Sequence, residues 1–399
     1  MTRPEDKNPW SRRQWLQFTS AATLGGALGT LSGCGGGVAV GVAGLLPGTG
    51  GTGQIAAVFA RGFIAGFGSV IVNGIRFDDS AASVQVDGIS GSSSALRLGM
   101  VIDVQGERGA DLTQGTARSI AAWSVAQGIV GSVLPGGVFT VAGITVTTNA
   151  NTVLDGLDSM AALSAGQRVT VWGLQADASA SRWTATRVAL APTMPASSLV
   201  STGLVQVIGD VRYVNGLRLA GTAAQALQAG QLVRVQGNLS SDGSTLQVQQ
   251  ASLQGLTQGP TAPTGEAEIE GVVTAVLSTT RFKLGDVEVD ASQATAQPTG
   301  AALAVGTRLD VHGVWQSGVL LARSIEIEDQ ETEYTLELTG YVEQYVNATD
   351  FIVRSQRCDA SKALLQNGTL ADLRTGVRVQ LKGSLAGSVL QVTELEFDH

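Results

Sequence analysis

An eight-residue pattern that occurs five times constrains the fold of this chain more than any other feature. The pattern is Gly-x-x-apolar-x-apolar-x-Gly. Its alternation of apolar and other residues is typical of a strand with one buried face. Because the copies start 64 to 76 residues apart, they indicate a tandem array of similar small units. The five copies occupy residues 99–106, 166–173, 230–237, 306–313 and 376–383.

The alternation predicts which side chains of each copy face a core. The two apolar positions of the pattern should point inward, and the residues next to them should point outward. The ten residues expected in cores are Ile102, Val104, Val169, Val171, Val233, Val235, Leu309, Val311, Val379 and Leu381.

Each unit also begins in the same way, with a glycine, an apolar alternation and a tight turn. The turns Asn73-Gly74 and Asn215-Gly216 lie between apolar runs. This is the strongest short-range signal for a β-hairpin, since both central residues need positive φ. Ala142-Gly143 and Gly285-Asp286 take the same place in their units. The opening glycines are Gly62, Gly128, Gly203, Gly271 and Gly340.

A short Ala/Leu-rich stretch before each Gly-x-x block predicts one or two helical turns, with Ser159 or Asp372 available as an N-cap. A last strand follows the block. The order of three strands, a short helix and two strands is that of an OB-like barrel. We therefore expect an all-β chain: a tandem array of five small OB-like five-stranded barrels, each with a short helix, after an N-terminal signal and a Gly-rich tether. Units of this size have marginal cores, so neighbouring barrels should pack together.

Composition shifts divide the chain into seven parts. Pro/Ser/Thr-rich stretches separate the second, third and fourth units, and such composition is typical of exposed linkers. The expected parts are an export signal (1–33), a lipidated Gly-rich tether (34–58), repeat 1 (59–123), repeat 2 (124–192), repeat 3 (199–254), repeat 4 (266–328) and repeat 5 (334–399).

The N-terminus carries the features of an export signal. Arg12 and Arg13 precede an uncharged, Gly/Ala-rich stretch that ends at Leu31-Ser32-Gly33-Cys34. The first part resembles a twin-arginine (Tat) signal and the second a bacterial lipobox, which implies a lipid on Cys34. Gly35 in place of Asp favours the outer membrane. The alternative is a membrane-spanning helix over about 24–46, which the many glycines disfavour.

The repeat resembles domain-of-unknown-function family 5666. The resemblance extends from about residue 60 to the C-terminus and is clearest in repeat 1. There it rests on Val72-Asn73-Gly74-Ile75, on Leu96-Arg97-Leu98-Gly99 and on the block that ends at Gly106. It implies secreted or envelope-anchored bacterial proteins built of small β-barrel repeats. It implies no established activity and no catalytic residues.

Charge and composition limit the possible partners. Residues 34–399 hold 21 basic and 31 acidic side chains, a net charge of −10, which disfavours nucleic acid as a partner. The chain has two cysteines and two histidines, so a His/Cys metal cluster cannot be built. No cofactor, nucleophile motif, phosphate-binding loop or carboxylate pair is indicated.

Single residues that could carry chemistry each have a simpler structural explanation. Cys358 aligns with Val289 and is expected to be a small core residue, not a reactive thiol. His312 lies at an outward position without a marked partner, and should be solvated or at an interface. Asp290 and Asp359 are expected to cap turns. The acidic run 326–337 lacks the spacing of a calcium loop and should be a solvated linker.

The tryptophans leave two functions open. Trp172, Trp183 and Trp315 fall near strand ends or on outward faces, as does Trp123, so they could contact a sugar, a partner protein or a neighbouring barrel. The leading hypothesis is a lipid-anchored, non-enzymatic binding or scaffolding protein of the cell envelope, facing the periplasm or the cell surface. The alternatives are an envelope glycan-binding protein that uses these tryptophans and, less favoured, an uncharacterised enzyme.

Overall fold

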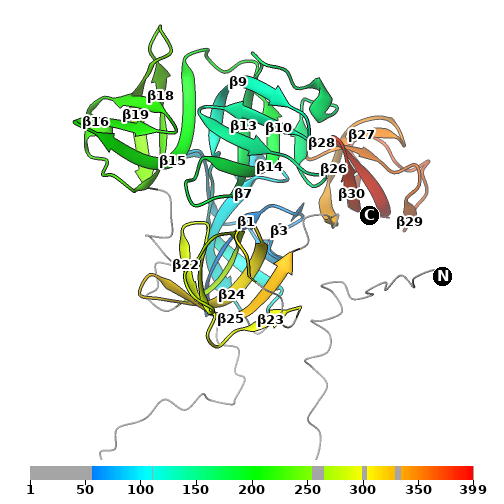
Figure 1. The fold of residues 1–399 in the computed structure, drawn as a ribbon. Coiled ribbons are helices and arrows are strands. Elements are labelled where there is room, and N and C mark those ends of the chain that lie inside the picture. Colours follow the sequence, from blue (N-terminus) through cyan, green and yellow to red (C-terminus); the bar gives the residue numbers. More distant parts are fainter. Residues whose placement is uncertain (1–55, 110, 254–264, 299–302, 329–333, 399) are drawn as a thin grey trace, which may run out of the picture. The chain divides into compact units, whose positions relative to one another are not determined.

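The computed structural model describes residues 56–109, 111–253, 265–298, 303–328 and 334–398, and these residues form an all-β structure (Figure 1). The predicted signal, with Arg12 and Arg13, and the predicted lipidation site Cys34 lie outside the described residues. Within the described ranges, none of the helices has the length and apolar character needed to cross a membrane. Strand β1 (Ala56–Phe63) takes up the end of the stretch that we assigned to the tether.

Repeat 2 forms a closed five-stranded barrel. Strand β9 (Ala126–Leu134) pairs antiparallel with β10 (Val138–Val141), which pairs with β11 (Ile144–Thr147) across the predicted hairpin. Strand β11 then pairs parallel with β14 (Arg182–Leu190), and β14 pairs antiparallel with β13 (Arg168–Gln175). Strand β13 returns to β9 and closes the ring. Closure leaves the ring without an open edge.

The same five kinds of pairing recur in repeats 3 and 4. In both, the first strand pairs with the second and the fourth, and the third pairs parallel with the fifth. In repeat 3 the strands are β15 (Ser198–Ile208), β16 (Val211–Val214), β17 (Leu217–Ala220), β18 (Leu232–Leu239) and β19 (Thr245–Leu253). In repeat 4 they are β20 (Glu266–Val276), β21 (Arg281–Leu284), β22 (Val287–Asp290), β24 (Arg308–Gln316) and β25 (Val319–Glu328).

Repeats 5 and 1 follow the same scheme, with the first strand of repeat 1 divided into β1 and β2. The strands of repeat 5 are β26 (Leu336–Asn347), β27 (Asp350–Val353), β28 (Gln356–Asp359), β30 (Arg378–Ala386) and β31 (Val389–Phe397). The other strands of repeat 1 are β2 (Gly66–Phe67), β3 (Val70–Val72), β4 (Ile75–Asp78), β7 (Val101–Arg108) and β8 (Gln114–Ala122).

The expectation of a short helix in every repeat is wrong for repeat 5, and in repeat 4 part of the expected stretch lies outside the described residues. Single turns occur in the first three repeats, as η2 (Ser93–Ala95), η3 (Met160–Ala162) and α2 (Thr222–Gln225). Ser159 precedes η3, but its side chain makes no capping bond. In repeat 5 the stretch around Asp372 is a turn, in which the Asp372 carboxylate accepts from the backbone and hydroxyl of Thr369.

In every repeat but the third, the connecting segment also contains a short strand, which the sequence analysis missed. It lies parallel to the last strand of its repeat. Pairing with that strand satisfies the backbone groups of these residues. These strands are β5 (Ser83–Val86), which also pairs with β6 (Ile89–Gly91), β12 (Val153–Asp155), β23 (Thr295–Gln297) and β29 (Leu364–Gln366).

The predicted core residues are confirmed. All ten apolar residues of the Gly-x-x blocks are at most 1% exposed. The glycine that closes each block lies where the register shifts between the fourth and fifth strands. A Cβ on any of these glycines would come within 2.5 Å of a backbone oxygen of the facing strand. The recurring glycine therefore permits a β-bulge and a close approach of two backbones.

The outward neighbours of these core residues depart from the expectation in repeats 2, 3 and 4. Thr170, Arg234 and Asp310 were expected to face solvent, but they are 8%, 2% and 8% exposed. In repeat 5 strand β30 alternates as expected, with Gln380 exposed between Val379 and Leu381. The alternation fails where another repeat covers the outer face, because both faces of the strand are then buried.

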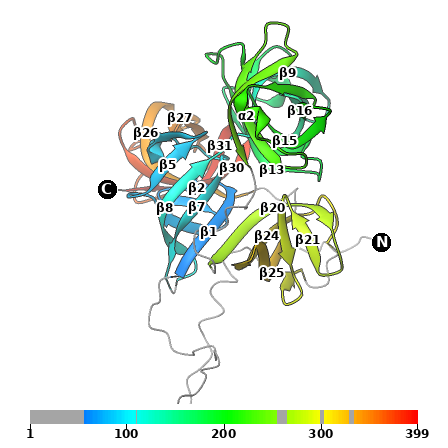
Figure 2. The ribbon, with the colours of Figure 1, turned by 90° about the vertical axis from the view of Figure 1, so that its left-hand side faces the viewer.

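The first strands of the repeats join the repeats to one another. Val58–Arg61 of β1 pair in parallel with Glu266–Ile269 of β20, and Figure 2 shows these two strands side by side. Strand β2 pairs in parallel with β26, and β9 pairs antiparallel with β15. Repeats 1, 4 and 5 therefore share one continuous sheet, and repeats 2 and 3 share another.

Candidate functional site

Four buried arginines lie where one repeat contacts another. Arg108, Arg187, Arg234 and Arg308 are between 2% and 5% exposed. Arg187 donates to the backbone oxygen of Leu98 in repeat 1 at 3.0 Å and also pairs with Asp155 of its own repeat. A buried guanidinium is costly unless it is paired, so each of these side chains needs its particular partners in place.

Arg308 of repeat 4 joins three repeats. It donates to Glu270 of its own repeat, and both side chains are buried. Its guanidinium carbon lies 5.2 Å from the ring centroid of Phe63 in repeat 1 and 5.0 Å from that of Tyr334 in repeat 5. Burial would lower the pKa of Arg308, but the charge and hydrogen bond of Glu270, together with the charges of Tyr334 and Glu328, outweigh it and raise the pKa.

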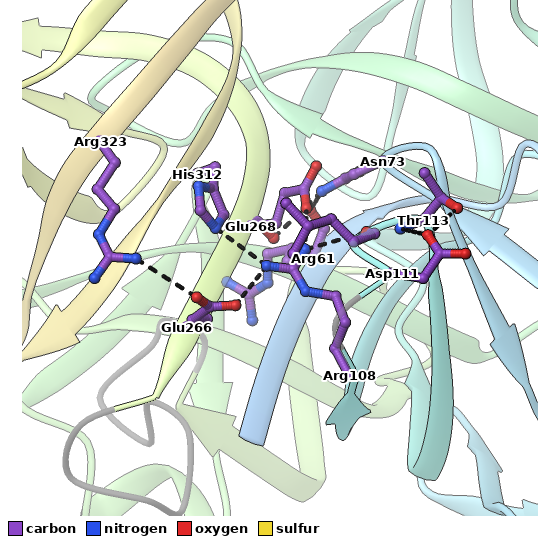
Figure 3. A network of polar contacts seen from close by, with 10 residues as sticks. Arg61, Asn73, Arg108, Asp111, Thr113, Glu266, Glu268, His312 and Arg323 are labelled. Atoms are coloured by element: carbon purple, nitrogen blue, oxygen red, sulfur yellow. Dashed lines mark hydrogen bonds and ion pairs between the residues drawn. The ribbon is translucent and has the colours of Figure 1, made fainter. Parts of the chain in front are cut away.

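A polar network surrounds Arg108 at the junction of β1 and β20 (Figure 3). Arg108 donates to Glu266 of repeat 4 and, at 3.3 Å, to Nε2 of His312. Arg323 lies 3.5 Å from the other oxygen of Glu266. Burial, together with the charge of Arg108, lowers the pKa of His312 below its ordinary value. His312 is therefore an interface residue, and it favours its neutral form. An interface was one of the two positions expected for it, and a solvated position was the other.

Asparagines of the predicted hairpins bond to the first strands. Asn73 Nδ2 donates to the backbone oxygens of Arg61 at 2.9 Å and of Glu268 at 3.3 Å, and so connects β1 with β20. Asn215 Nδ2 donates to the Thr202 oxygen at 2.9 Å and to Ser201 Oγ at 3.0 Å. The sequence indicated these asparagines only as turn residues, and their bonds to the first strands were missed.

Asp87 of repeat 1 accepts hydrogen bonds from two other repeats. It lies in the turn between β5 and β6, and it accepts from the backbone and hydroxyl of Ser124 and from Gln127 of repeat 2. Arg234 of repeat 3 also donates to it, at 2.8 Å. The guanidinium carbon of Arg234 lies 5.5 Å from the ring centroid of Trp123. No sequence pattern marked Asp87, since its partners lie far away along the chain.

A cavity of about 90 Å³ lies beside these networks, between residues of repeats 1, 2, 3 and 4. Arg61 lies in its wall and donates to both oxygens of Asp103, at 2.5 and 2.7 Å. Burial would lower the pKa of Arg61, but Asp103 raises it above its ordinary value. Asp286 lies 3.9 Å from the same guanidinium. The wall also includes Trp123 and Thr202.

Trp172, Trp183 and Trp315, which could have contacted a sugar, a partner protein or a neighbouring barrel, are all buried. They are 5%, 6% and 7% exposed. Trp172 belongs to the same hydrophobic cluster as core residues of repeats 1 and 5, so it is an interface contact between repeats. Trp183 donates from Nε1 to the Ala180 oxygen at 3.0 Å, and Trp315 packs in the core of repeat 4. The rings are buried because other repeats or their own barrels cover them.

Cys358, Asp290 and Asp359 have the structural roles expected of them, whereas the described part of the acidic run lies in strands β25 and β26 and not in a solvated linker. Cys358 is fully buried, and burial raises the pKa of its thiol to about 12. Asp290 accepts from the backbone of Ser292 and Asp359 from that of Ser361. Part of the acidic run lies outside the described residues, while Glu337 pairs with Arg76 of repeat 1. The described ranges contain no group of three or more His, Cys, Asp or Glu side chains placed to hold a metal.

Comparison with known families identifies two of the repeats. Residues 127–189 and 270–326 match the family model DUF5666, a domain of unknown function. The matched stretches run from the first strand to the last strand of repeat 2 and of repeat 4. Each DUF5666 match thus covers the five pairing strands of one repeat. No curated protein matches the chain.

Proposed function

We propose that this protein is a non-enzymatic scaffold of the bacterial cell envelope, built of five OB-like barrels and anchored to the outer membrane by a lipid on Cys34. The fold part of the proposal rests on the strand pairings. In every repeat the third strand runs parallel to the fifth, and the first pairs with both the second and the fourth. This is the strand order of an OB barrel.

The observation that carries the scaffolding role is the use of first strands as connectors. β1 pairs with β20, β2 with β26 and β9 with β15, so backbone ladders join repeats 1, 4 and 5 to one another and repeat 2 to repeat 3. The buried charged groups at these junctions are engaged in holding the repeats together. Arg108 bonds to Glu266, and Arg234 bonds to Asp87. Repeats joined in this way would be held at fixed separations within each sheet, which suits the assembly of partners.

Cross-linking in intact cells tests this proposal. Tagged wild-type protein and a Cys34→Ala variant would be cross-linked, and the co-purifying proteins identified. We expect a reproducible envelope protein that is recovered with the wild type and lost with the variant. Acylation would be checked directly by mass spectrometry of the mature N-terminus. Recovery of no specific partner, or substrate turnover by the purified protein that a single substitution abolishes, would contradict a non-enzymatic scaffold.

A further inference from the structure

A leucine stands three positions before every Gly-x-x block, and in repeat 4 this leucine is the least buried of the five. The leucines are Leu96, Leu163, Leu227, Leu303 and Leu373. Four of them are between 1% and 7% exposed and belong to the hydrophobic clusters of their repeats. Leu303 is only partly buried where it packs against the cluster of repeat 4. The end of this barrel is therefore covered less completely by its leucine than the equivalent end of the others.

The short strand β23 of repeat 4 also carries a smaller side chain than its counterparts. Ala296 in this strand pairs with Ile325 of the last strand. In repeats 1, 2 and 5 the residue that pairs with the equivalent position is larger, namely Val84, Leu154 and Leu365. Val84 and Leu154 are 3% and 6% exposed, and Leu365 packs against the core of its repeat. The alanine thus leaves unfilled the space that a larger aliphatic side chain occupies elsewhere.

A cavity of about 270 Å³ lies at this end of repeat 4, and the described residues that line it all belong to this repeat. Ala296 and Leu303 are both in its wall, together with Ala291 and Ala294. All four residues are partly buried and not enclosed, so a molecule that enters the cavity can touch them. An apolar cavity of about 150 Å³ holds benzene, so this cavity has room for a larger apolar group.

The cavity combines an apolar wall with a few neutral polar groups. Its polar lining consists of the exposed residues Ser278, Thr279 and Thr280, in the turn between β20 and β21. Their hydroxyls can both donate and accept hydrogen bonds. None of the described lining residues is charged, so an ion that entered would lose water without gaining a counter-charge. A neutral molecule with an apolar body and a hydroxyl group can use both parts of the lining.

The turn that supplies the hydroxyls is fixed to the apolar wall. The backbone nitrogen of Ala291 donates to the backbone oxygen of Thr280 at 2.7 Å. Within the turn, the backbone nitrogen of Arg281 donates to Ser278 Oγ at 3.1 Å. The polar and apolar sides of the cavity therefore keep their places without a ligand, as is usual for small-molecule sites.

We propose that this cavity binds one small neutral amphiphile, with an apolar body of about six to ten carbon atoms and a hydroxyl group. The apolar body lies against Ala294, Ala296 and Leu303, and the hydroxyl group lies at the turn 278–280. This binding site goes beyond the proposed scaffolding role. It is also independent of lipid anchoring, because it lies within a single barrel.

Isothermal titration calorimetry of the full-length chain tests the proposal. The probes are 1-hexanol, 1-octanol and 2-phenylethanol, and glucose is the control for a molecule that has hydroxyl groups but no apolar body. We expect saturable binding of at least one alcohol with a Kd in the millimolar range or tighter, and no binding of glucose. The heat-capacity change of binding should be negative, which marks the burial of apolar surface.

Two results of this titration would overturn the proposal. One is saturation by none of the alcohols, which would favour an apolar side chain of a protein partner as the occupant. The other is binding of glucose with the same affinity as the alcohols, because the apolar wall would then contribute nothing.

Two neighbouring residues of β23 provide a matched pair of variants. Ala296→Leu introduces the residue found at the equivalent positions 154 and 365, and should fill the cavity. Thr295→Leu adds the same side chain on the opposite, exposed face of the strand, where the equivalent Leu364 is 65% exposed. We expect Ala296→Leu to weaken alcohol binding by about tenfold or more and Thr295→Leu to leave it unchanged.

Thermal unfolding and a second wall variant show whether the loss of binding is specific. Ala296→Leu should be at least as thermally stable as the wild type, because the same fold accommodates leucine at two equivalent positions. Ala294→Val adds a smaller group to the same wall, and should also weaken alcohol binding. Equal affinities of wild type, Ala296→Leu and Ala294→Val would place any bound alcohol elsewhere and overturn the assignment of this cavity.

Discussion

Arg234 and Asp87 are separated by 147 positions in the chain, yet their side chains meet at 2.8 Å. Arg234 belongs to repeat 3 and Asp87 to repeat 1, and their side chains are 1% and 12% exposed. The arginine also donates from Nε to the backbone oxygen of Ser124 in repeat 2, at 2.9 Å. One carboxylate and one guanidinium thus join three repeats. Burial lowers the pKa of Arg234 despite Asp87, which shows how strongly this charge depends on its partner.

Removing the carboxylate should therefore destabilise the protein strongly. Asp87→Ala leaves Arg234 buried without a counter-charge, and removes the acceptor of Ser124 and Gln127. We expect a loss of about 3–5 kcal/mol in the free energy of unfolding, measured by urea denaturation. Glu107→Ala is the control, because the partner of Glu107, Arg118, is 70% exposed. That variant should lose less than about 1 kcal/mol, and equal losses would contradict a structural role for the buried pair.

The hairpin turns of repeats 2 and 3 offer a matched pair of glycines. Gly143 and Gly216 have φ of +80° and +78°, so an alanine at either position adopts a strained backbone at a cost of about 1–2 kcal/mol. A Cβ on Gly143 would also lie 2.3 Å from the Asn215 oxygen of repeat 3, whereas a Cβ on Gly216 meets nothing within 4 Å.

Gly143→Ala should therefore destabilise by about 1–3 kcal/mol more than Gly216→Ala, in the same urea experiment. The difference measures the contact between repeats, since the strain within the turn is common to both variants. Identical losses would mean that repeats 2 and 3 do not touch at this turn in solution.

The buried thiol predicts a loss of stability in alkali. Burial raises the pKa of Cys358 from 9.0 to about 12, so above pH 9 the unfolded chain releases a proton that the folded chain keeps. Stability should fall as the pH rises above 9, by up to about 1.4 kcal/mol per pH unit from this group. Cys358→Val introduces the residue found at the equivalent position 289. This variant should lack the loss of stability that the thiol causes above pH 9. Urea curves at pH 8 and 10 test this, and parallel losses in wild type and variant would contradict it.

The neutral histidine predicts an effect at acid pH. The pKa of His312 is lowered from 6.5 by burial and by Arg108, so the unfolded chain binds a proton more readily than the folded chain. The stability from this group is present above pH 6.5 and is lost as the pH falls below it. His312→Gln introduces the residue found at the equivalent positions 105 and 236. The stability of this variant should depend less on pH between 7.5 and 5 than that of the wild type. Thermal unfolding across this range measures the difference, and equal slopes for the two proteins would disprove it.

The local structure of the repeats could be predicted because it depends on neighbouring residues. Alternation placed Val169, Val171 and their equivalents in cores, and Asn73-Gly74 marked a hairpin. The short helices were partly wrong, since in repeat 5 the stretch is a turn in which Asp372 accepts from Thr369. Alternation also could not decide what the tryptophans contact. Trp172 occupies an outward position in its strand, and another repeat covers that position.

The candidate site could not be predicted, since its residues come from four repeats. Arg61, Thr202 and Asp286 belong to no common motif, and only the packing of the repeats brings them to one cavity. A pattern with a period of about two residues reports which face of a strand is apolar. It carries no information on which distant segment covers the other face.

The sequence alone determined the number of repeats, the strand alternation and the hairpin turns, because these follow from backbone preferences and from burial within one repeat. The tertiary structure decided how the repeats join. The pairing of β1 with β20 and of β9 with β15 depends on long-range contacts. The first strands of the repeats share one sequence pattern, so the pattern does not specify which of them pair. The partners of Arg108, Arg187, Arg234 and Arg308 were decided in the same way. A buried charge needs a partner from whichever segment the fold brings beside it.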